Sequence, residues 1–177
     1  MSQRAAAVNV DVDSLYLYYG LHGLETDDAN NAVWTRGVRR FAELFDELDV
    51  RATFFIVASD LERWPEARQI AGELAAAGHE LASHTWSHPY DLTRQSPEAI
   101  GVEIDRSFDL LSEVAGRPIT GFRAPGYTIS DPVYEALSQR GYGYDSSLFP
   151  CPPYYLAKAA VMGAMRLRGR RSDAILD

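Results

Sequence analysis

The sequence predicts an α/β protein built around a parallel sheet or barrel. Short apolar segments rich in β-branched and aromatic residues alternate along the chain with segments of helical periodicity. A length of 177 residues with 46% hydrophobic content fits one ordinary globular domain. Polar clusters follow four of the β-like segments, and the carboxyl ends of parallel strands are where functional groups gather.

The first strand and helix are expected near the N-terminus. The segment Ala5–Asp11 is short, apolar and β-leaning, so we expect a buried strand in the centre of the sheet. Gly20–Asn31 is rich in Gly, Asp and Asn and is typical of a loop. Thr35–Leu48 carries apolar residues at helical spacing and predicts a helix.

The middle of the chain repeats this alternation. Ala52–Ala58 is a compact β-like run, and Glu80–Ser83 predicts a third short strand. Between them, Pro65–Ala77 predicts a helix closed by Gly78. A further helix is expected to begin at Pro97, with Ser96 as its N-cap. Its apolar face would consist of Ile100, Ile104, Phe108 and Leu111.

The last third of the chain predicts two more strands and a helix. Ile119–Phe122 and a segment near Tyr144 are strand-like, and the helix between them spans Asp131–Arg140 and ends at Gly141. We treat residues 1–177 as one domain in which residues 151–177 add an extra helix, within Tyr154–Leu167, and a basic tail. The basic run at 166–171 is expected to be a solvated helix end.

Composition narrows the classes of function. Seventeen Lys and Arg against 25 Asp and Glu give a net charge of −8, which argues against nucleic acid or an anionic membrane surface as a partner. The single cysteine, Cys151, excludes an internal disulfide and a cysteine-rich zinc site. No apolar stretch is long enough to span a membrane and no signal-type segment is visible, so we expect a cytoplasmic protein. The composition leaves open whether the protein forms a homo-oligomer.

Two histidines and one aspartate form the candidate metal site. His84 and His88 are four residues apart, a spacing that brings both rings to one side of a turn. Asp13 would complete a three-ligand site with positions left for water and substrate, as in catalytic divalent-metal sites. The alternative is a pair of partly exposed histidines near a turn. His79 is expected to be structural, and the role of His22 is open.

A second aspartate precedes this ligand by two residues. In an extended segment the side chains of Asp11 and Asp13 point the same way, and a twist at the strand end would give them different partners. A divalent metal and Arg123 could offset their charge. The alternative is that both aspartates cap a turn.

The ordered motifs Asp-x-Asp, His-x-x-x-His, Arg-x-Pro and Asp-Ser-Ser resemble the NodB-type polysaccharide deacetylases, or carbohydrate esterase family four. The segments 52–55, 77–81 and 144–150 support the resemblance, which covers about residues 8–150. It implies a distorted (β/α)7-type barrel lacking its last strands, with a domain that is incomplete at its C-terminus. The Asp-x-Asp start departs from the adjacent aspartates of the commonest first motif and is similar to peptidoglycan deacetylases and cyclic amide hydrolases.

The resemblance also implies roles for individual residues. Asp13, His84 and His88 would hold a divalent metal, with Zn²⁺ preferred over Co²⁺, Ni²⁺ or another ion, while Asp11 would be the general base oriented by Arg123. Substrate or oxyanion contacts would come from the third and fourth motifs, with the backbone N–H after the proline belonging to Gly126. These contact residues are Pro125, Gly126, Tyr127 and Asp145. The family's late histidine, which protonates the leaving amine, has no counterpart, because no histidine follows His88.

We therefore expect a metal-dependent hydrolase that removes an N-acyl group, most simply acetyl, from an amino-sugar polysaccharide or glycoconjugate. Tyr90, Tyr127 and Phe149 could stack on a sugar ring or belong to the core. One rival is hydrolysis of small cyclic amides or imides on the same scaffold. Another is an Fe(II) oxygenase, which the same ligand types would suit but the βα pattern does not support. The third is a non-catalytic metal or glycan binder.

Overall fold

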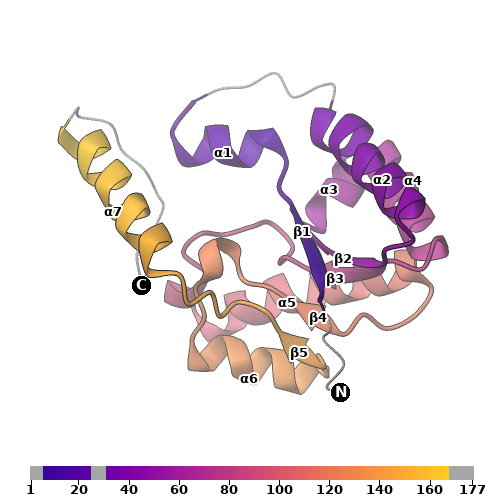
Figure 1. Ribbon diagram of the computed structural model, residues 1–177. Coiled ribbons are helices and arrows are strands. Elements are labelled where there is room, and N and C mark those ends of the chain that lie inside the picture. The colour runs from indigo at the N-terminus through magenta and orange to yellow at the C-terminus, as the bar shows by residue number, and fades with distance from the viewer. Residues whose placement is uncertain (1–5, 25–30, 168–177) are drawn as a thin grey trace, which may run out of the picture.

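The computed structural model describes residues 6–24 and 31–167 and contains one parallel sheet of five strands (Figure 1). The strands lie side by side in chain order, and each is parallel to its neighbour. They are β1 (Val8–Val12), β2 (Ala52–Ile56), β3 (Glu80–Ser83), β4 (Gly121–Phe122) and β5 (Tyr144–Asp145). This arrangement confirms the α/β class and agrees with a distorted barrel of the deacetylase kind.

The expectation of a central position for the first strand is wrong. Because the strands are arranged in chain order, β1 lies at an edge of the described sheet and pairs with β2. Its first residues are exposed, and only Val12 at its carboxyl end is fully buried. The strand also begins at Val8 and reaches Val12, so the predicted range of Ala5–Asp11 is displaced toward the N-terminus.

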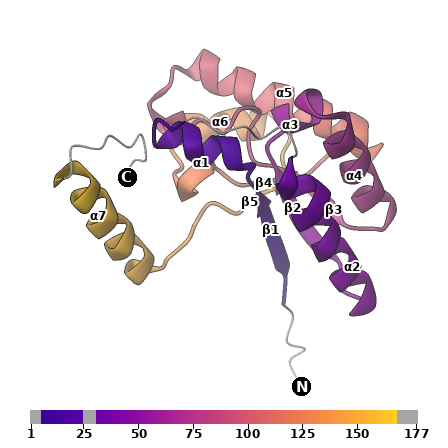
Figure 2. The same cartoon turned by 90° about the horizontal axis from the view of Figure 1, so that it is seen from above.

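Most of the helices connect the strands and cover the outer side of the sheet, whereas the helix after β5 stands apart from it (Figure 2). The α-helices are α1 (Leu15–Leu21), α2 (Arg39–Glu47), α3 (Ser59–Arg63), α4 (Pro65–Ala76), α5 (Pro97–Ala115), α6 (Asp131–Arg140) and α7 (Pro152–Leu167). A π-helix, η1 (Val33–Val38), precedes α2, and two 3₁₀ turns are η2 (Leu92–Arg94) and η3 (Pro125–Tyr127).

The helix boundaries marked by capping residues are confirmed. Ser96 caps α5 by accepting a hydrogen bond from the Ala99 N–H at 3.3 Å. Helices α5 and α6 end at Gly116 and Gly141, both in the left-handed conformation that glycine adopts without a steric penalty. The helix expected over Thr35–Leu48 is instead divided, because its first turns belong to η1.

Two helices were not predicted. Helix α1 contains Gly20 and Leu21, which the sequence placed in a loop, and residues 25–30 of that loop lie outside the described residues. Its apolar residues are contiguous rather than periodic, and none is buried, so the usual helical signal is absent. Helix α3 has only five residues, too few to show a periodic pattern.

The core lies between the sheet and the helices on its outer side. Apolar side chains of β1 to β3 pack there against η1, α4 and α5. The largest fully buried side chains include Trp34, Phe54, Ile56, Ile70, Leu74, Leu111 and Phe122. On the opposite face, Glu80 of β3 accepts hydrogen bonds from Thr53 of β2, Tyr144 of β5 and Thr120, which directly precedes β4. The apolar face of the sheet therefore packs against the helices, while polar side chains on the other face bond neighbouring segments to one another.

The register sets the carboxyl ends of all five strands in one row. The paired residues across the sheet are Val12, Ile56, Ser83, Phe122 and Asp145. The residues immediately after the strands therefore emerge at the same edge. This alignment is the structural reason why motifs far apart in the sequence can form one site.

The extra helix expected after residue 151 is confirmed as α7 (Figure 1). The basic tail lies outside the described residues from 168 onward. Among the described helices, none combines the length and the apolar character needed to cross a membrane.

Candidate metal centre

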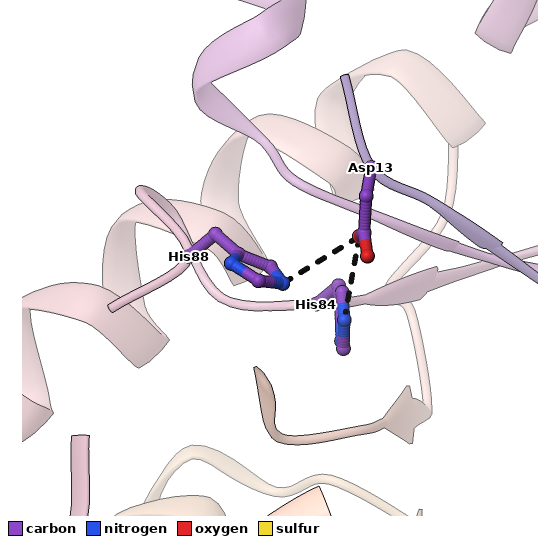
Figure 3. Close-up of side chains that lie close together, drawn as sticks. All are labelled: Asp13, His84 and His88. Carbon is purple, nitrogen blue, oxygen red and sulfur yellow. Dashed lines mark ion pairs between the residues drawn. The ribbon is translucent and has the colours of Figure 1, made fainter. Parts of the chain in front are cut away.

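Asp13, His84 and His88 meet at the carboxyl edge of the sheet (Figure 3). Asp13 Oδ1 lies 3.5 Å from His84 Nε2 and 3.6 Å from His88 Nε2. The side chains of His84 and His88 are 3% and 1% exposed, and that of Asp13 is 13% exposed. The three residues predicted as ligands are thus brought together, and all are largely shielded from water.

The hydrogen bond made by His84 identifies the ring nitrogen whose lone pair faces Asp13. His84 Nδ1 lies 2.6 Å from the carbonyl oxygen of Arg123. Since a carbonyl only accepts, Nδ1 must carry the proton, and in the neutral ring Nε2 is then an acceptor. A metal-binding histidine characteristically has this arrangement, with its other nitrogen donating to a backbone carbonyl.

His88 is held neutral by its surroundings. Burial, and next the neighbouring His84, lower the pKa of His88 to about 4, while Asp13 acts in the opposite direction. Its ring meets the His84 ring edge to face, with centroids 4.9 Å apart. A neutral imidazole is the form that binds a metal, so this environment suits a ligand.

The donor set fits a divalent cation. Asp13 Oδ1 and His88 Nδ1 are buried atoms without a hydrogen-bond partner among the described residues. An unpartnered buried carboxylate oxygen is costly, and a metal would satisfy it. Tetrahedral bonds of about 2.0–2.2 Å space neighbouring ligand atoms roughly 3.4 Å apart, close to the two distances from Asp13 Oδ1. The sequence expectation of an Asp and two His ligands therefore fits this geometry.

The loop between the two histidines is strained and tightly bonded. Thr85 and His88 have φ angles of 67° and 61°, in the left-handed region that non-glycine residues rarely occupy. The Thr85 hydroxyl donates to the His84 carbonyl at 2.5 Å and accepts from the His88 N–H at 3.0 Å. These bonds hold the turn that directs both rings toward Asp13.

Glu103 on α5 anchors the same loop from outside. Its carboxylate accepts from the backbone N–H of Trp86 at 3.0 Å, and from the N–H and hydroxyl of Ser87 at 2.8 and 2.6 Å. Sequence reasoning missed this residue. A signal was present, because Glu103 occupies a position on the buried helix face between Ile100 and Ile104, where a charged residue calls for partners.

A second buried carboxylate, that of Asp60 on α3, holds the chain just after Asp13. It accepts hydrogen bonds from Ser14 Oγ at 2.5 Å, Trp34 Nε1 at 2.9 Å and the Tyr16 hydroxyl at 3.1 Å. Burial raises the pKa of Asp60, while these donors act in the opposite direction. The strand end that carries Asp13 is thereby tied to α3 and η1.

Asp11 and Asp13 have separate partners. Arg123 Nη1 donates to Asp11 Oδ1 at 2.5 Å, and the Tyr127 hydroxyl donates to Asp11 Oδ2 at 3.1 Å. The sequence predicted that Arg123 would orient Asp11, and the geometry brings the two together. Burial, followed by the charge of Asp11, raises the pKa of Tyr127 to about 12, so its hydroxyl stays protonated at neutral pH.

The Asp-Ser-Ser motif supports Arg123 rather than reaching the ligands. Arg123 Nε donates to the Ser146 carbonyl at 3.1 Å, and Nη2 donates to Ser146 Oγ at 2.7 Å. Ser147 Oγ accepts from the Ala124 N–H at 2.8 Å and donates to Asp145 Oδ1 at 2.5 Å. Asp145 bonds to Ser147 and, through Oδ2, accepts from the Tyr134 hydroxyl on α6 at 3.4 Å, and the substrate contact expected of it stays a prediction.

The turn after Arg123 is built on a glycine. Gly126 has φ of 64°, and a β-carbon there would lie 3.7 Å from both Lys158 Nζ and a ring carbon of Tyr90. Tyr127 follows with φ of 62°, which places its hydroxyl on Asp11. The oxyanion contacts expected of Pro125, Gly126 and Tyr127 stay predictions, but the turn does lie beside the acidic pair.

Aromatic side chains surround this edge. The Tyr90 ring meets the His88 ring edge to face at 4.6 Å. Tyr127 stacks on Phe149 at 4.8 Å, and Tyr154 from α7 contacts both rings edge to face. None of these residues belongs to the buried core, so the alternative that they are core side chains is not supported.

The other two histidines do not join the ligands. His79 lies at the opposite end of β3, where its Nδ1 accepts from the Ala52 N–H at 3.1 Å. This is the structural role expected of it. His22 follows α1 as its C-cap residue and is exposed.

Comparison with known proteins identifies the family of this chain. The family model for polysaccharide deacetylases matches residues 23–144, more than half of the chain. The chain belongs to the polysaccharide deacetylase family. The match begins after Asp11 and Asp13, so the assignment of these two residues rests on the geometry of the site.

Relatives of this family align over different parts of the chain. A peptidoglycan deacetylase of Helicobacter pylori is 29% identical over 158 residues, which cover 85% of this chain and 52% of the relative. Chitin deacetylase 1 of Cryptococcus neoformans var. grubii is 31% identical over 99 residues, covering 56% of this chain and 20% of that protein. The chain spans about half, or less, of the length of these curated family members.

Solved structures of the family share the fold. A Mycobacterium smegmatis protein classed with the polysaccharide deacetylases superposes with a TM-score of 0.67 at 26% identity. The superposition covers 81% of this chain and 50% of that protein. The five-stranded parallel sheet with outer helices is therefore shared with the matched half of that structure.

Proposed function

We propose that this chain belongs to a metal-dependent hydrolase that removes an N-acetyl group from an amino-sugar polysaccharide or glycoconjugate. The observation that carries the proposal is the buried, unpartnered Asp13 Oδ1 facing two histidine nitrogens, with Asp11 and Arg123 beside it. Family membership and relatives that deacetylate peptidoglycan and chitin support the substrate class.

Asp13, His84 and His88 would hold the metal. Two imidazoles and one carboxylate suit Zn²⁺, which we propose as the ion, and Co²⁺ or Ni²⁺ could replace it. When bound, such an ion lowers the pKa of a water molecule and polarises an acyl oxygen. The strained loop at Thr85 and the carboxylate of Glu103 would keep the two rings in place for it.

Asp11 would act as the general base. Its two oxygens accept from Arg123 and Tyr127, yet each keeps a further lone pair for the proton of the attacking water. Arg123 is itself fixed by Ser146 and stacks over the ring of Phe55 at 4.0 Å. A fixed guanidinium orients the base and compensates its charge without moving during the reaction.

Backbone groups of the turn at Gly126 would stabilise the oxyanion. Preorganised N–H donors aimed at a developing negative charge contribute strongly to acyl transfer. Among the residues of this chain, we assign the protonation of the leaving amine to Asp11, which gains its proton from the attacking water. One water and one amide then yield acetic acid and the free amine, which at neutral pH become acetate and an ammonium group by transfer of the remaining proton.

The proposal is tested by acetate release. The purified chain, stripped with a chelator and then loaded with Zn²⁺ or Co²⁺, is incubated with N-acetylglucosamine oligomers and, separately, with hydantoins and imides. The proposal expects acetate from the oligomers with the loaded protein only. Turnover of the cyclic amides instead would favour the alternative hydrolase, and metal or glycan binding without any acyl release would favour a non-catalytic binder.

A further inference from the structure

The two carboxylate oxygens of Asp13 are in different situations. The hydroxyl of Tyr18 on α1 donates to Oδ2 at 2.9 Å. Oδ1 is buried, has no hydrogen-bond partner among the described residues, and is the oxygen that faces His84 and His88. One oxygen is thus occupied by the protein, while the other is left to the space between the two rings.

Tyr18 reaches Asp13 because helix α1 starts almost directly after Asp13. The helix begins at Leu15, and its first turn brings the side chain five residues beyond Asp13 back over the carboxylate. Helix α1 buries none of its side chains, and Tyr18 is 44% exposed. The ring of Tyr18 therefore contributes little to packing. The hydrogen bond from its hydroxyl to Asp13 is the contact that best accounts for its position.

A hydrogen bond to one oxygen influences how a carboxylate binds a cation. A free carboxylate can bind through one oxygen or both, whereas a donor held against one oxygen competes with a metal for that oxygen and favours the other as the ligand. Groups that hydrogen-bond to metal ligands orient them and raise metal affinity. In this site such a donor would favour the oxygen that already lies close to both histidine nitrogens.

We propose that Tyr18 is a positioning residue that makes Asp13 a one-oxygen ligand of the metal through Oδ1. The inference rests on the proposed metal centre and extends it to α1, a helix that precedes the segment matched by the family model. It assigns a function to a helix that otherwise contributes no buried side chain. It also explains why an exposed aromatic residue lies at the edge of the site.

The test compares Tyr18→Phe with Tyr19→Phe, its neighbour on the same helix. Each variant loses one hydroxyl and keeps its ring. Metal affinity is measured by competition between the apo protein and a chromophoric chelator for Zn²⁺, and the coordination by the visible absorption spectrum of the Co²⁺ form. Thermal unfolding of each apo protein reports on structure alone.

Tyr18→Phe is expected to bind Zn²⁺ about 10- to 100-fold more weakly and to show a changed Co²⁺ spectrum, while apo unfolding stays as in the wild type. Tyr19→Phe should match the wild type in all three. Wild-type affinity and spectrum in Tyr18→Phe would overturn the inference, as would lower apo stability with an unaltered spectrum. A wild-type chain that binds no metal would instead refute the metal centre itself.

Discussion

The two ends of β3 place histidines in opposite chemical situations. At the amino end, His79 is buried among Phe45 and Phe54, and its Nδ1 accepts a backbone hydrogen bond from Ala52. At the carboxyl end, His88 is equally buried, but its Nδ1 has no partner and its Nε2 faces a carboxylate. Both rings are kept neutral, since burial lowers the pKa of each.

The difference teaches how to separate a structural histidine from a ligand. Burial does not distinguish the two, because His79 and His88 are both less than 5% exposed. The distinction lies in the partners: one ring completes the hydrogen bonding of the sheet, whereas the other leaves polar atoms unsatisfied. The site is therefore distinguished by buried polar atoms without hydrogen-bond partners, which come together from the end of β1 and the loop after β3.

The largest test of this comparison removes a ligand at one end and the structural histidine at the other. Asp13→Ala and His84→Ala are each expected to abolish stoichiometric binding of Zn²⁺ or Co²⁺, because only two ligands remain. His79→Gln should retain one equivalent, since the amide oxygen can still accept from Ala52. Metal analysis of the purified variants measures this, and unchanged metal content in either ligand variant would refute the assignment.

The next test separates the base from the ligands. Asp11→Asn should lower the rate of acetate release about 10²- to 10⁴-fold, the usual contribution of a general base. It should leave the metal content unchanged, because Asp11 bonds to Arg123 and Tyr127 rather than to the histidines. Steady-state kinetics and metal analysis on the same preparation check both halves. Retained activity would exclude Asp11 as the base.

Much of this site was predictable from the sequence, because the strand ends are in register. Once β1, β3 and β4 were recognised as parallel strands, the residues that follow them had to share one edge. Asp13, His84 and Arg123 could therefore be placed together without coordinates. Helix α1 could not be predicted, because its apolar residues are contiguous and do not follow helical spacing. The hydrogen bond from Tyr18 to Asp13 could therefore not be predicted either.

The position of the first strand within the sheet could not be predicted from the sequence either. An apolar run such as that in β1 is typical of a central strand, but apolar character does not specify neighbours. The chain-order pairing that leaves β1 at an edge depends on long-range contacts with β2. Glu103 was different, since its place on an apolar helix face was visible and only its partners were not.

A smaller effect is expected where the ligand loop is anchored. Glu103→Gln replaces one acceptor oxygen by an NH₂ group, which then faces a hydrogen-bond donor of Trp86 or Ser87. The free energy of unfolding should fall by about 1–3 kcal/mol, and Zn²⁺ should bind more weakly. Urea unfolding of the apo protein and chelator competition measure the two effects.

The matched control is Glu113→Gln on the same helix. Glu113 pairs with Arg68 at 2.6 Å on an exposed surface, where an ion pair contributes at most about 1 kcal/mol. Its removal should not alter metal affinity. Equal losses of stability and affinity in both variants would show that Glu103 has no special relation to the ligand loop.

The smallest expected effect is a pH dependence of the free energy of unfolding, caused by His79 at the amino end of β3. Burial, and next the charge of Arg51, lower the pKa of His79 in the folded protein. Below its ordinary pKa of about 6.5, the unfolded chain binds a proton that folded His79 resists, so the free energy of unfolding falls as pH falls. The stability difference between wild type and His79→Gln should therefore be more favourable to the wild type at pH 8 than at pH 5.5. A difference independent of pH would contradict the neutral structural role.

The most direct measurement is the anomalous diffraction of a crystal grown with Zn²⁺ and recorded at the zinc absorption edge. The account predicts a peak bonded to Asp13 Oδ1, His84 Nε2 and His88 Nε2 at about 2.0–2.2 Å, and none at His79. An ion bound elsewhere, or a fully loaded protein with no peak between these three atoms, would contradict the metal centre.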